Sequence, residues 1–144
     1  YSLAAPWLSQ RQLTTAADAL AANHLASAVA AAKRAHSWDP LSTQALADWA
    51  AYVDLQGDPL KAESLYGNEV SLEPESSAAW FDLGSFYAFH LSWRNAYVAL
   101  DKAWKLDRFG PAGTACGVLD QARHKVFDIW PPSCPRGRPR AVSP

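Results

Sequence analysis

The sequence predicts an all-α protein built from helix–turn–helix repeats. Alanine, the residue with the highest helix propensity, fills 11 of the 20 positions from Ala16 to Ala35. No stretch alternates apolar and polar residues over the length of a strand, so a β-sheet is not expected. The pair Asp39-Pro40 recurs 34 residues later as Glu73-Pro74, and a fixed period of this length is typical of helical repeat proteins.

This period divides the chain into a lead-in segment, residues 1–8, and three repeats within residues 9–110. The repeats are 9–42, 43–76 and 77–110, and each is expected to hold two antiparallel helices. The six predicted helices lie near residues 9–22, 25–37, 43–56, 59–71, 77–90 and 93–106. Small residues recur where the paired helices should cross, namely Ala16, Ala50 and Gly84 on the first helices and Ala28, Ala62 and Ala96 on the second.

Local signals mark the ends of these helices. In the second repeat, Gly57 suits a left-handed helix end, Asp58 can cap the next helix and Pro59 suits its first turn. Further N-caps are expected from Ser92, from Ser42 or Thr43, and from Ser76 or Ser77, while Pro40 and Pro74 end the helices before them.

Two segments follow the repeats. Residues 111–130 are expected to hold a capping helix between Gly117 and Ile129, with an apolar stripe formed by Val118, Leu119, Ala122, Val126, Phe127 and Ile129. Residues 131–144 are rich in Pro and Arg and offer little to bury, so we expect them to be disordered or held by neighbours.

The third repeat resembles the tetratricopeptide repeat (TPR) family. Its Trp80, Leu83-Gly84 and Tyr87 follow the spacing W-x2-L-G-x2-Y, and Ala96, Leu100 and Ala103 continue the pattern. The second repeat matches at Leu46, Ala50, Gly57, Ala62, Tyr66, Leu72 and Pro74, but departs from the family at Trp49 and Glu69. The first keeps Ala16, Ala28, Ala35 and Pro40 but has Gln12 in the Trp position. The resemblance implies a right-handed solenoid of three repeats in which Trp80, Tyr87 and Tyr66 belong to the core.

The same resemblance implies a concave groove lined by the first helix of each repeat. Its positions are Gln10, Leu13, Thr14, Ala17 and Leu20; Gln44, Ala47, Asp48, Ala51, Asp54 and Leu55; and Ala78, Phe81, Asp82, Ser85, Ala88 and Phe89. Partner contacts are expected from Leu20, Gln44, Asp48, Asp54, Leu55, Phe81, Asp82, Ser85 and Phe89. Family members that clamp an acidic chaperone C-terminus use Lys, Arg and Asn here, and this groove has none of them. An apolar or basic protein or peptide is therefore the expected partner. The alternative for Phe81 and Phe89 is packing on a neighbouring helix.

The net charge is only −1, which excludes nucleic-acid binding driven by the overall charge of the chain. The distribution is uneven. Residues 43–76 carry one Lys against seven acids, a charge of −6, whereas residues 111–144 carry +3.

Other chemistry finds no support in the sequence, and we expect no catalytic residue, metal or cofactor. His24, His36, His90 and His124 lack the spacing of zinc ligands, and phosphate-binding glycine motifs do not occur. Cys116 lacks a suitably spaced His for nucleophilic catalysis, and whether it pairs with Cys134 stays open.

A second resemblance concerns a larger protein. The stretches RAHSWDPLSTQALADWA, GDPLKAESLY and KAWKLDRFGP resemble the C-terminal repeat segment of bacterial O-antigen ligase or polymerase membrane proteins. This resemblance implies an extracytoplasmic accessory domain; a cytoplasmic location is the alternative. The chain starts at Tyr1 and has no Met, so we expect a fragment or a processed piece. No apolar run is long enough to insert into a membrane.

Three hypotheses of function follow. The first is a non-catalytic scaffold that binds a peptide or partner helix in its groove. The second is the accessory domain of a membrane ligase or polysaccharide polymerase. The third is a self-association module that stacks on another copy.

Overall fold

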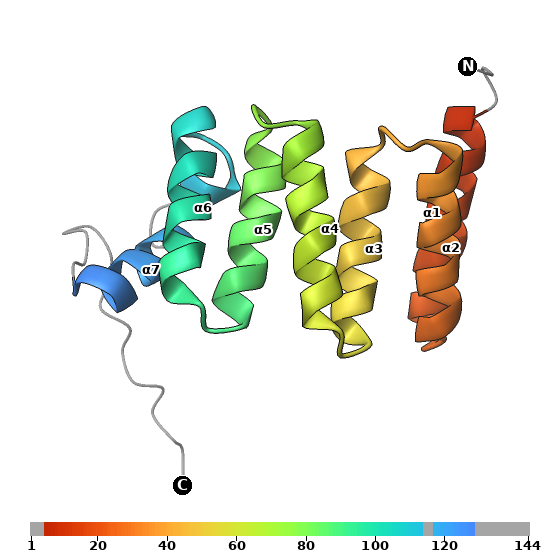
Figure 1. Ribbon diagram of the computed structural model, residues 1–144, viewed down its shortest axis with the longest axis horizontal. Helices are drawn as coiled ribbons and strands as arrows, with labels where there is room; N and C mark the ends of the chain where they lie inside the picture. The colour runs from red at the N-terminus through yellow and green to blue at the C-terminus, as the bar shows by residue number, and fades with distance from the viewer. Residues whose placement is uncertain (1–4, 114–116, 129–144) are drawn as a thin grey trace, which may run out of the picture. The chain divides into compact units, whose positions relative to one another are not determined.

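The computed structural model describes residues 5–113 and 117–128, which form helices throughout (Figure 1). The helices are α1 (Ala5–Ala21), α2 (Leu25–Trp38), α3 (Thr43–Leu55), α4 (Pro59–Leu72), α5 (Ser77–Phe89), α6 (Trp93–Leu106) and α7 (Val118–Phe127), with a 3₁₀ turn, η1 (Pro111–Gly113). The chain divides into two compact units, Tyr1–Glu75 and Ser76–Pro144. The first unit contains α1 to α4, and the second contains α5 to α7. The predicted all-α repeat class and the predicted seventh helix are both confirmed.

Helix boundaries agree with the sequence expectations except at the first helix. That helix begins at Ala5 rather than near residue 9, so Pro6 and Trp7 are helical. Proline is tolerated in the first helical turn, where its missing N–H would have no intrahelical partner. Trp7 also receives the Arg11 guanidinium 5.6 Å from its ring centroid, one helical turn away. Helices α2 to α6 begin and end within one residue of the predicted positions, and α7 ends at Phe127, two residues before the predicted end.

Three of the predicted N-caps form hydrogen bonds. Ser42 accepts from the Ala45 N–H at 3.2 Å, Asp58 from the Lys61 N–H at 3.2 Å, and Ser76 from the Ala79 N–H at 3.4 Å. Ser92 occupies the N-cap position of α6 but makes no capping hydrogen bond. Its ψ of 65° lies outside the extended conformation of Ser42 and Ser76, which aims a short hydroxyl at the helix end.

A left-handed residue closes the first helix of every repeat. Asn23, Gly57 and Leu91, each 34 residues from the next, have φ of 60°, 89° and 59°. In each turn the following N–H donates to the carbonyl five residues back: His24 to Ala19, Asp58 to Val53 and Ser92 to Tyr87. This is the Schellman arrangement. The sequence indicated it only at Gly57, because Leu91 lacks the conformational freedom that glycine has.

Small residues form the core of the first unit. Ala16, Ala28, Ala31 and Ala32 are fully buried where α1 crosses α2, and the ring of Tyr52 packs on them. Trp49 is half-buried against the same alanines. Trp49 stands where the TPR family prefers Leu, and the small alanines of the first repeat leave room for the larger ring. Lys61 Nζ lies over that ring at 5.7 Å from its centroid.

The second unit has a core of its own. Gly84 on α5 meets Leu100 on α6, and Leu100 is fully buried beside Ala96, Leu119 and Ala122. Helix α7 therefore covers apolar side chains of the α5–α6 hairpin. The remainder of its predicted stripe is less enclosed. Phe127 is half-exposed, and its ring lies nearly perpendicular to the Tyr97 ring with the two centroids 4.9 Å apart.

Charged contacts also attach α7 to α6. Arg123 pairs with Asp101 at 3.6 Å and with Asp120 at 3.5 Å, and its guanidinium lies 5.4 Å from the centroid of the Trp104 ring. Lys105 reaches Asp101 at 2.6 Å from the adjacent turn of α6. Hence Asp101 receives cations from both helices.

Several sequence predictions concern residues outside the described ranges. They include Cys116, Cys134, Ile129, residues 1–4 of the lead-in and the Pro/Arg-rich segment 131–144. Among the described helices, none combines the length and the apolarity needed to cross a membrane.

Candidate partner-binding groove

Helix α3 presents a single stripe of the predicted groove. Gln44, Asp48 and Leu55 are spaced by four and seven residues, which places them on one face of the helix. Gln44 Nε2 donates to Asp48 Oδ1 at 2.9 Å. Gln44 is exposed, Asp48 is half-buried, and Leu55 is 62% exposed. The stripe therefore offers a carboxylate, an amide and an apolar side chain.

The environment of Asp48 disfavours its negative charge. Burial raises the pKa of this carboxyl above its ordinary value of 3.8, and the hydrogen bond from Gln44 opposes that rise. Tyr52, one turn further along α3, has its pKa raised by burial and then by the Asp48 charge. A cation that approached Asp48 would stabilise the ionised carboxylate.

Among the other predicted groove positions of the first unit, Gln10, Thr14 and Ala17 are exposed on α1, whereas Leu20, Leu13 and Asp54 are less accessible. Leu20 is half-buried and packs on the alanine cluster formed by α1 and α2, so much of its side chain belongs to the core. Leu13 is buried with Ala35 and Ala45, which removes it from any binding surface. Asp54, near the end of α3, is half-buried.

Helix α5 carries the groove residues of the second unit, and the two phenylalanines differ. Phe81 is half-buried and packs against the core formed with α6 and α7. Phe89, the last residue of α5, is 77% exposed, and its ring meets the His90 ring edge-on at 5.3 Å. Packing on a neighbouring helix therefore accounts for Phe81, whereas Phe89 presents most of its ring to the surface.

Two more groove positions on α5 differ in what they can offer. Asp82 is half-buried. The Ser85 hydroxyl is enclosed, with no hydrogen-bond partner among the described residues, so it is not accessible to a ligand. Ala88 is buried as well. The accessible groove residues are thus fewer than the sequence predicted.

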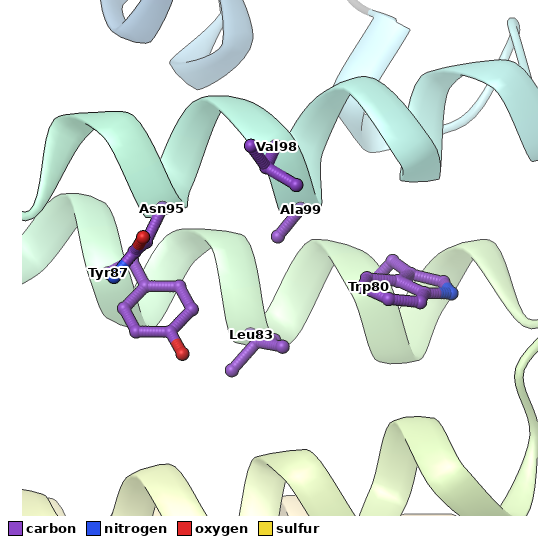
Figure 2. Close-up of a pocket in the computed structure, with 6 residues that line it drawn as sticks. All are labelled: Trp80, Leu83, Tyr87, Asn95, Val98 and Ala99. Carbon is purple, nitrogen blue, oxygen red and sulfur yellow. The ribbon is translucent and has the colours of Figure 1, made fainter.

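The sequence did not indicate the depression that α5 and α6 form (Figure 2). It encloses about 250 Å³ and is lined by Trp80, Leu83 and Tyr87 from α5 and by Asn95, Val98 and Ala99 from α6. Trp80 and Tyr87 were expected to be core residues, yet both are half-buried. Their spacing of seven residues places both on the face of α5 that lines the depression.

A second depression lies in the first unit. It encloses about 310 Å³ and is lined by His36, Pro40, Leu46, Asn68, Ser71 and Leu72. The His36 ring lies 5.8 Å from the Trp49 ring, centroid to centroid. Within residues 5–113 and 117–128, no three His, Cys, Asp or Glu side chains come together as a metal site would require.

Comparison with known proteins rests on structure. No protein-family model matches the sequence, and no curated protein matches it. The TPR domain of Sgt2 from Aspergillus fumigatus matches with a TM-score of 0.71 at 19% identity, over 93% of this chain and 91% of that chain. The Arabidopsis OM64 TPR domain matches at 0.70 and 12% identity, over 85% and 99%. The first TPR of RPAP3 (Spaghetti), bound to the HSP90 peptide SRMEEVD, matches at 0.70 and 12% identity, over 83% and 94%.

These matches establish the fold. The chain has the all-α helical repeat fold of TPR domains, as its repeat motifs indicated. The same matches lend no support to the resemblance to O-antigen ligases, which stays a prediction.

Proposed function

We propose that this chain is a non-catalytic scaffold for a peptide or a partner helix, in which α3 of the first unit and α5 of the second unit each present a binding face. One observation carries the proposal: an aspartate and a large apolar residue occur on both helices at the same repeat positions. Asp48 and Leu55 on α3 correspond, 34 residues later, to Asp82 and Phe89 on α5. Each pair puts a carboxylate two turns before an apolar residue that ends the helix.

Exposure supports this assignment. Leu55 and Phe89 are 62% and 77% exposed, although burying either side chain would contribute about 1.5–3 kcal/mol. Each side chain can therefore serve as an anchor for a partner. The RPAP3 domain with its bound HSP90 peptide is an example of this fold taking a peptide ligand.

The charge of these faces favours a partner with basic and apolar residues. The HSP90 peptide SRMEEVD ends in an acidic sequence. Asp48 and Asp82 would repel such an end and attract lysine or arginine, so we expect a different class of peptide here. Across such a face, charge sets the choice of partner and apolar burial supplies the affinity.

A random-peptide library selected on the intact chain tests the proposal. Selected peptides should bind Phe89→Ala and Leu55→Ala about tenfold more weakly than the unmodified chain, because each change removes an exposed anchor. Leu60→Ala is the matched control, since Leu60 is 80% exposed but lies on α4. Asp82→Lys should weaken basic peptides further. Affinities that none of the groove variants changes would refute binding at these faces.

Self-association is measured on the same samples. Sedimentation of the chain over a wide range of concentrations should give a single monomer mass if the scaffold proposal is sufficient. A mass that rises with concentration, and that Phe89→Ala restores to the monomer value, would assign the exposed face to a second copy instead.

A further inference from the structure

Helix α3 of the first unit carries a carboxylate and an amide that are joined by one hydrogen bond. Gln44 Nε2 donates to Asp48 Oδ1 at 2.9 Å, and no other hydrogen bond or ion pair reaches either side chain within residues 5–113 and 117–128. Gln44 is exposed, and Asp48 Oδ2 is not among the enclosed polar atoms of the described chain. Asp48 Oδ2 and Gln44 Oε1 are therefore two neighbouring acceptors without a donor.

The cations of the first unit make their contacts elsewhere. Residues 1–75 carry nine Asp or Glu residues against four Lys or Arg residues. Of these four cations, Arg11 and Lys61 each lie over a tryptophan ring, and Arg34 donates to a glutamine side chain of α1. The negative charge of Asp48 is thus unbalanced in a unit that is acidic as a whole. A positively charged group of a partner would complement it.

Arginine fits this pair of acceptors better than lysine does. A guanidinium is planar and presents N–H donors in a fixed fork, so it can donate to Asp48 Oδ2 and to Gln44 Oε1 at the same time. It is also more weakly hydrated than an ammonium group, which lowers the cost of placing it beside a half-buried carboxylate. Lysine supplies the charge but not the planar fork.

The apolar part of the α3 face favours an extended peptide over a helix. Among the large apolar side chains of α3, Leu55 alone is exposed, at 62%. A partner helix that lies in a groove binds through a series of apolar anchors, spaced by three and four residues. A single anchor cannot match such a series, but it can receive one apolar side chain of an extended peptide.

The distance between the two contact points matches the polyproline II conformation. Asp48 and Leu55 are seven residues apart on α3, which is about 10 Å along the helix axis. In polyproline II, residues three apart lie on the same edge of the peptide and are separated by about 9 Å. In a β-strand, residues on the same face are separated by about 7 Å or about 13 Å, so neither spacing matches as well.

We propose that the α3 face binds an extended peptide segment in which an arginine, held by Asp48 and Gln44, is separated by two residues from a large apolar residue that packs on Leu55. This inference rests on the proposed function, because it names the class of peptide that one of the two faces takes. It distinguishes arginine from lysine and an extended segment from a helix.

The test uses the intact chain and two fluorescein-labelled peptides, GSRPPLSG and GSLPPRSG, which carry the pair in the two possible directions. At least one should bind, as measured by fluorescence anisotropy. Replacing its arginine by lysine should weaken binding about five- to tenfold, because lysine keeps the charge but loses the paired donors. Replacing it by citrulline, which keeps the shape without the charge, should weaken binding by about tenfold or more. One added proline between the pair should weaken it about threefold.

Variants of the chain locate the arginine. Asp48→Asn should weaken the arginine peptide about tenfold and remove its advantage over the lysine peptide. Gln44→Ala should weaken the arginine peptide about threefold and the lysine peptide less than twofold. Glu73→Gln is the matched control, because it also removes one negative charge from the second repeat but lies at the end of α4, and its effect should be less than about twofold. Circular dichroism verifies the fold of each variant.

A double-mutant cycle locates the apolar residue. Leu55→Ala and replacement of the peptide's leucine by alanine should be non-additive by a factor of about three or more, because they remove the same contact. The same change in the peptide should be additive with Asp48→Asn, since the two groups do not touch.

The inference is wrong if neither peptide binds, if lysine replaces arginine without loss, if Asp48→Asn and Glu73→Gln have equal effects, or if Leu55→Ala is additive with the change of the peptide's leucine. The library peptides separate this failure from failure of the proposed function. If library peptides lose affinity on Leu55→Ala or Phe89→Ala while the defined peptides do not bind, only the inference fails. If library affinities depend on neither variant and the defined peptides do not bind, both fail.

Discussion

Helices α5 and α6 approach closely at Gly84, so a change to alanine there adds steric strain while it raises helix propensity. A Cβ at Gly84 would lie 2.6 Å from Leu100 Cγ, 2.8 Å from its Cδ2 and 3.1 Å from its backbone N. Leu100 is fully buried, so its side chain has no free space to enter. Gly84→Ala therefore forces α5 and α6 apart by a few tenths of an ångström, at a cost of about 1–3 kcal/mol.

The helix itself gains from the same change. Alanine is more favourable than glycine in a helix interior by about 1 kcal/mol, which offsets part of the strain. We expect a net loss of about 1 kcal/mol, seen in urea unfolding as a midpoint lower by about 0.5 M. Gly67→Ala is the matched control, because Gly67 lies in α4 with nothing within 4 Å of the added methyl. That variant should gain about 0.5–1 kcal/mol.

A double variant isolates the contact. In the first repeat the equivalent residues are Ala16 and Ala32, both fully buried, so a pair of alanines fits at this crossing. Leu100→Ala alone should cost about 2–5 kcal/mol, and its cost should fall by about 1–2 kcal/mol when Gly84→Ala is present. If Gly84→Ala stabilises as much as Gly67→Ala, or if the two changes are additive, the reasoning from this close approach is wrong.

Three further predictions concern the turns, the α7 attachment and the groove. Gly57→Ala should lower the free energy of unfolding, measured in urea, by about 1 kcal/mol. No atom lies within 4 Å of the added Cβ, but a φ of 89° strains any residue that has one. Leu91→Gly should not lower it by a comparable amount. Arg123→Ala should cost about 1 kcal/mol through loss of its contacts with Trp104 and two carboxylates, whereas a change at the exposed Arg94 should be neutral. The pKa of Asp48 in the folded chain lies above its ordinary value of 3.8. Ionisation of this carboxyl therefore lowers the free energy of unfolding as the pH rises from about 3.8 through the folded pKa. Asp48→Asn should remove this decline, which is measured as the difference in urea stability between the two proteins from about pH 3 to pH 7; an identical pH profile would contradict it.

Much of the secondary structure could be predicted from the sequence because its signals are local. The 34-residue period, the cap at Asp58 and the left-handed Gly57 each depend on hydrogen bonds and steric limits within a few residues. The left-handed Leu91 could not be recognised in this way, because leucine carries no such preference. Its equivalence to Gly57 in the repeat was the available signal.

Accessibility of the candidate groove was decided by tertiary structure. Phe81 and Phe89 are the same residue type on the same helix, yet one packs on a core that includes Leu119 and Ala122 of α7 while the other is exposed. Burial depends on which side chains arrive from distant parts of the chain, and a repeat pattern does not contain that information. The sequence alone determined the repeat, its helices and the acidic character of the second repeat. Only the folded structure decided which side chains on those helices are accessible to a partner, because packing in the core buries some of the predicted groove residues.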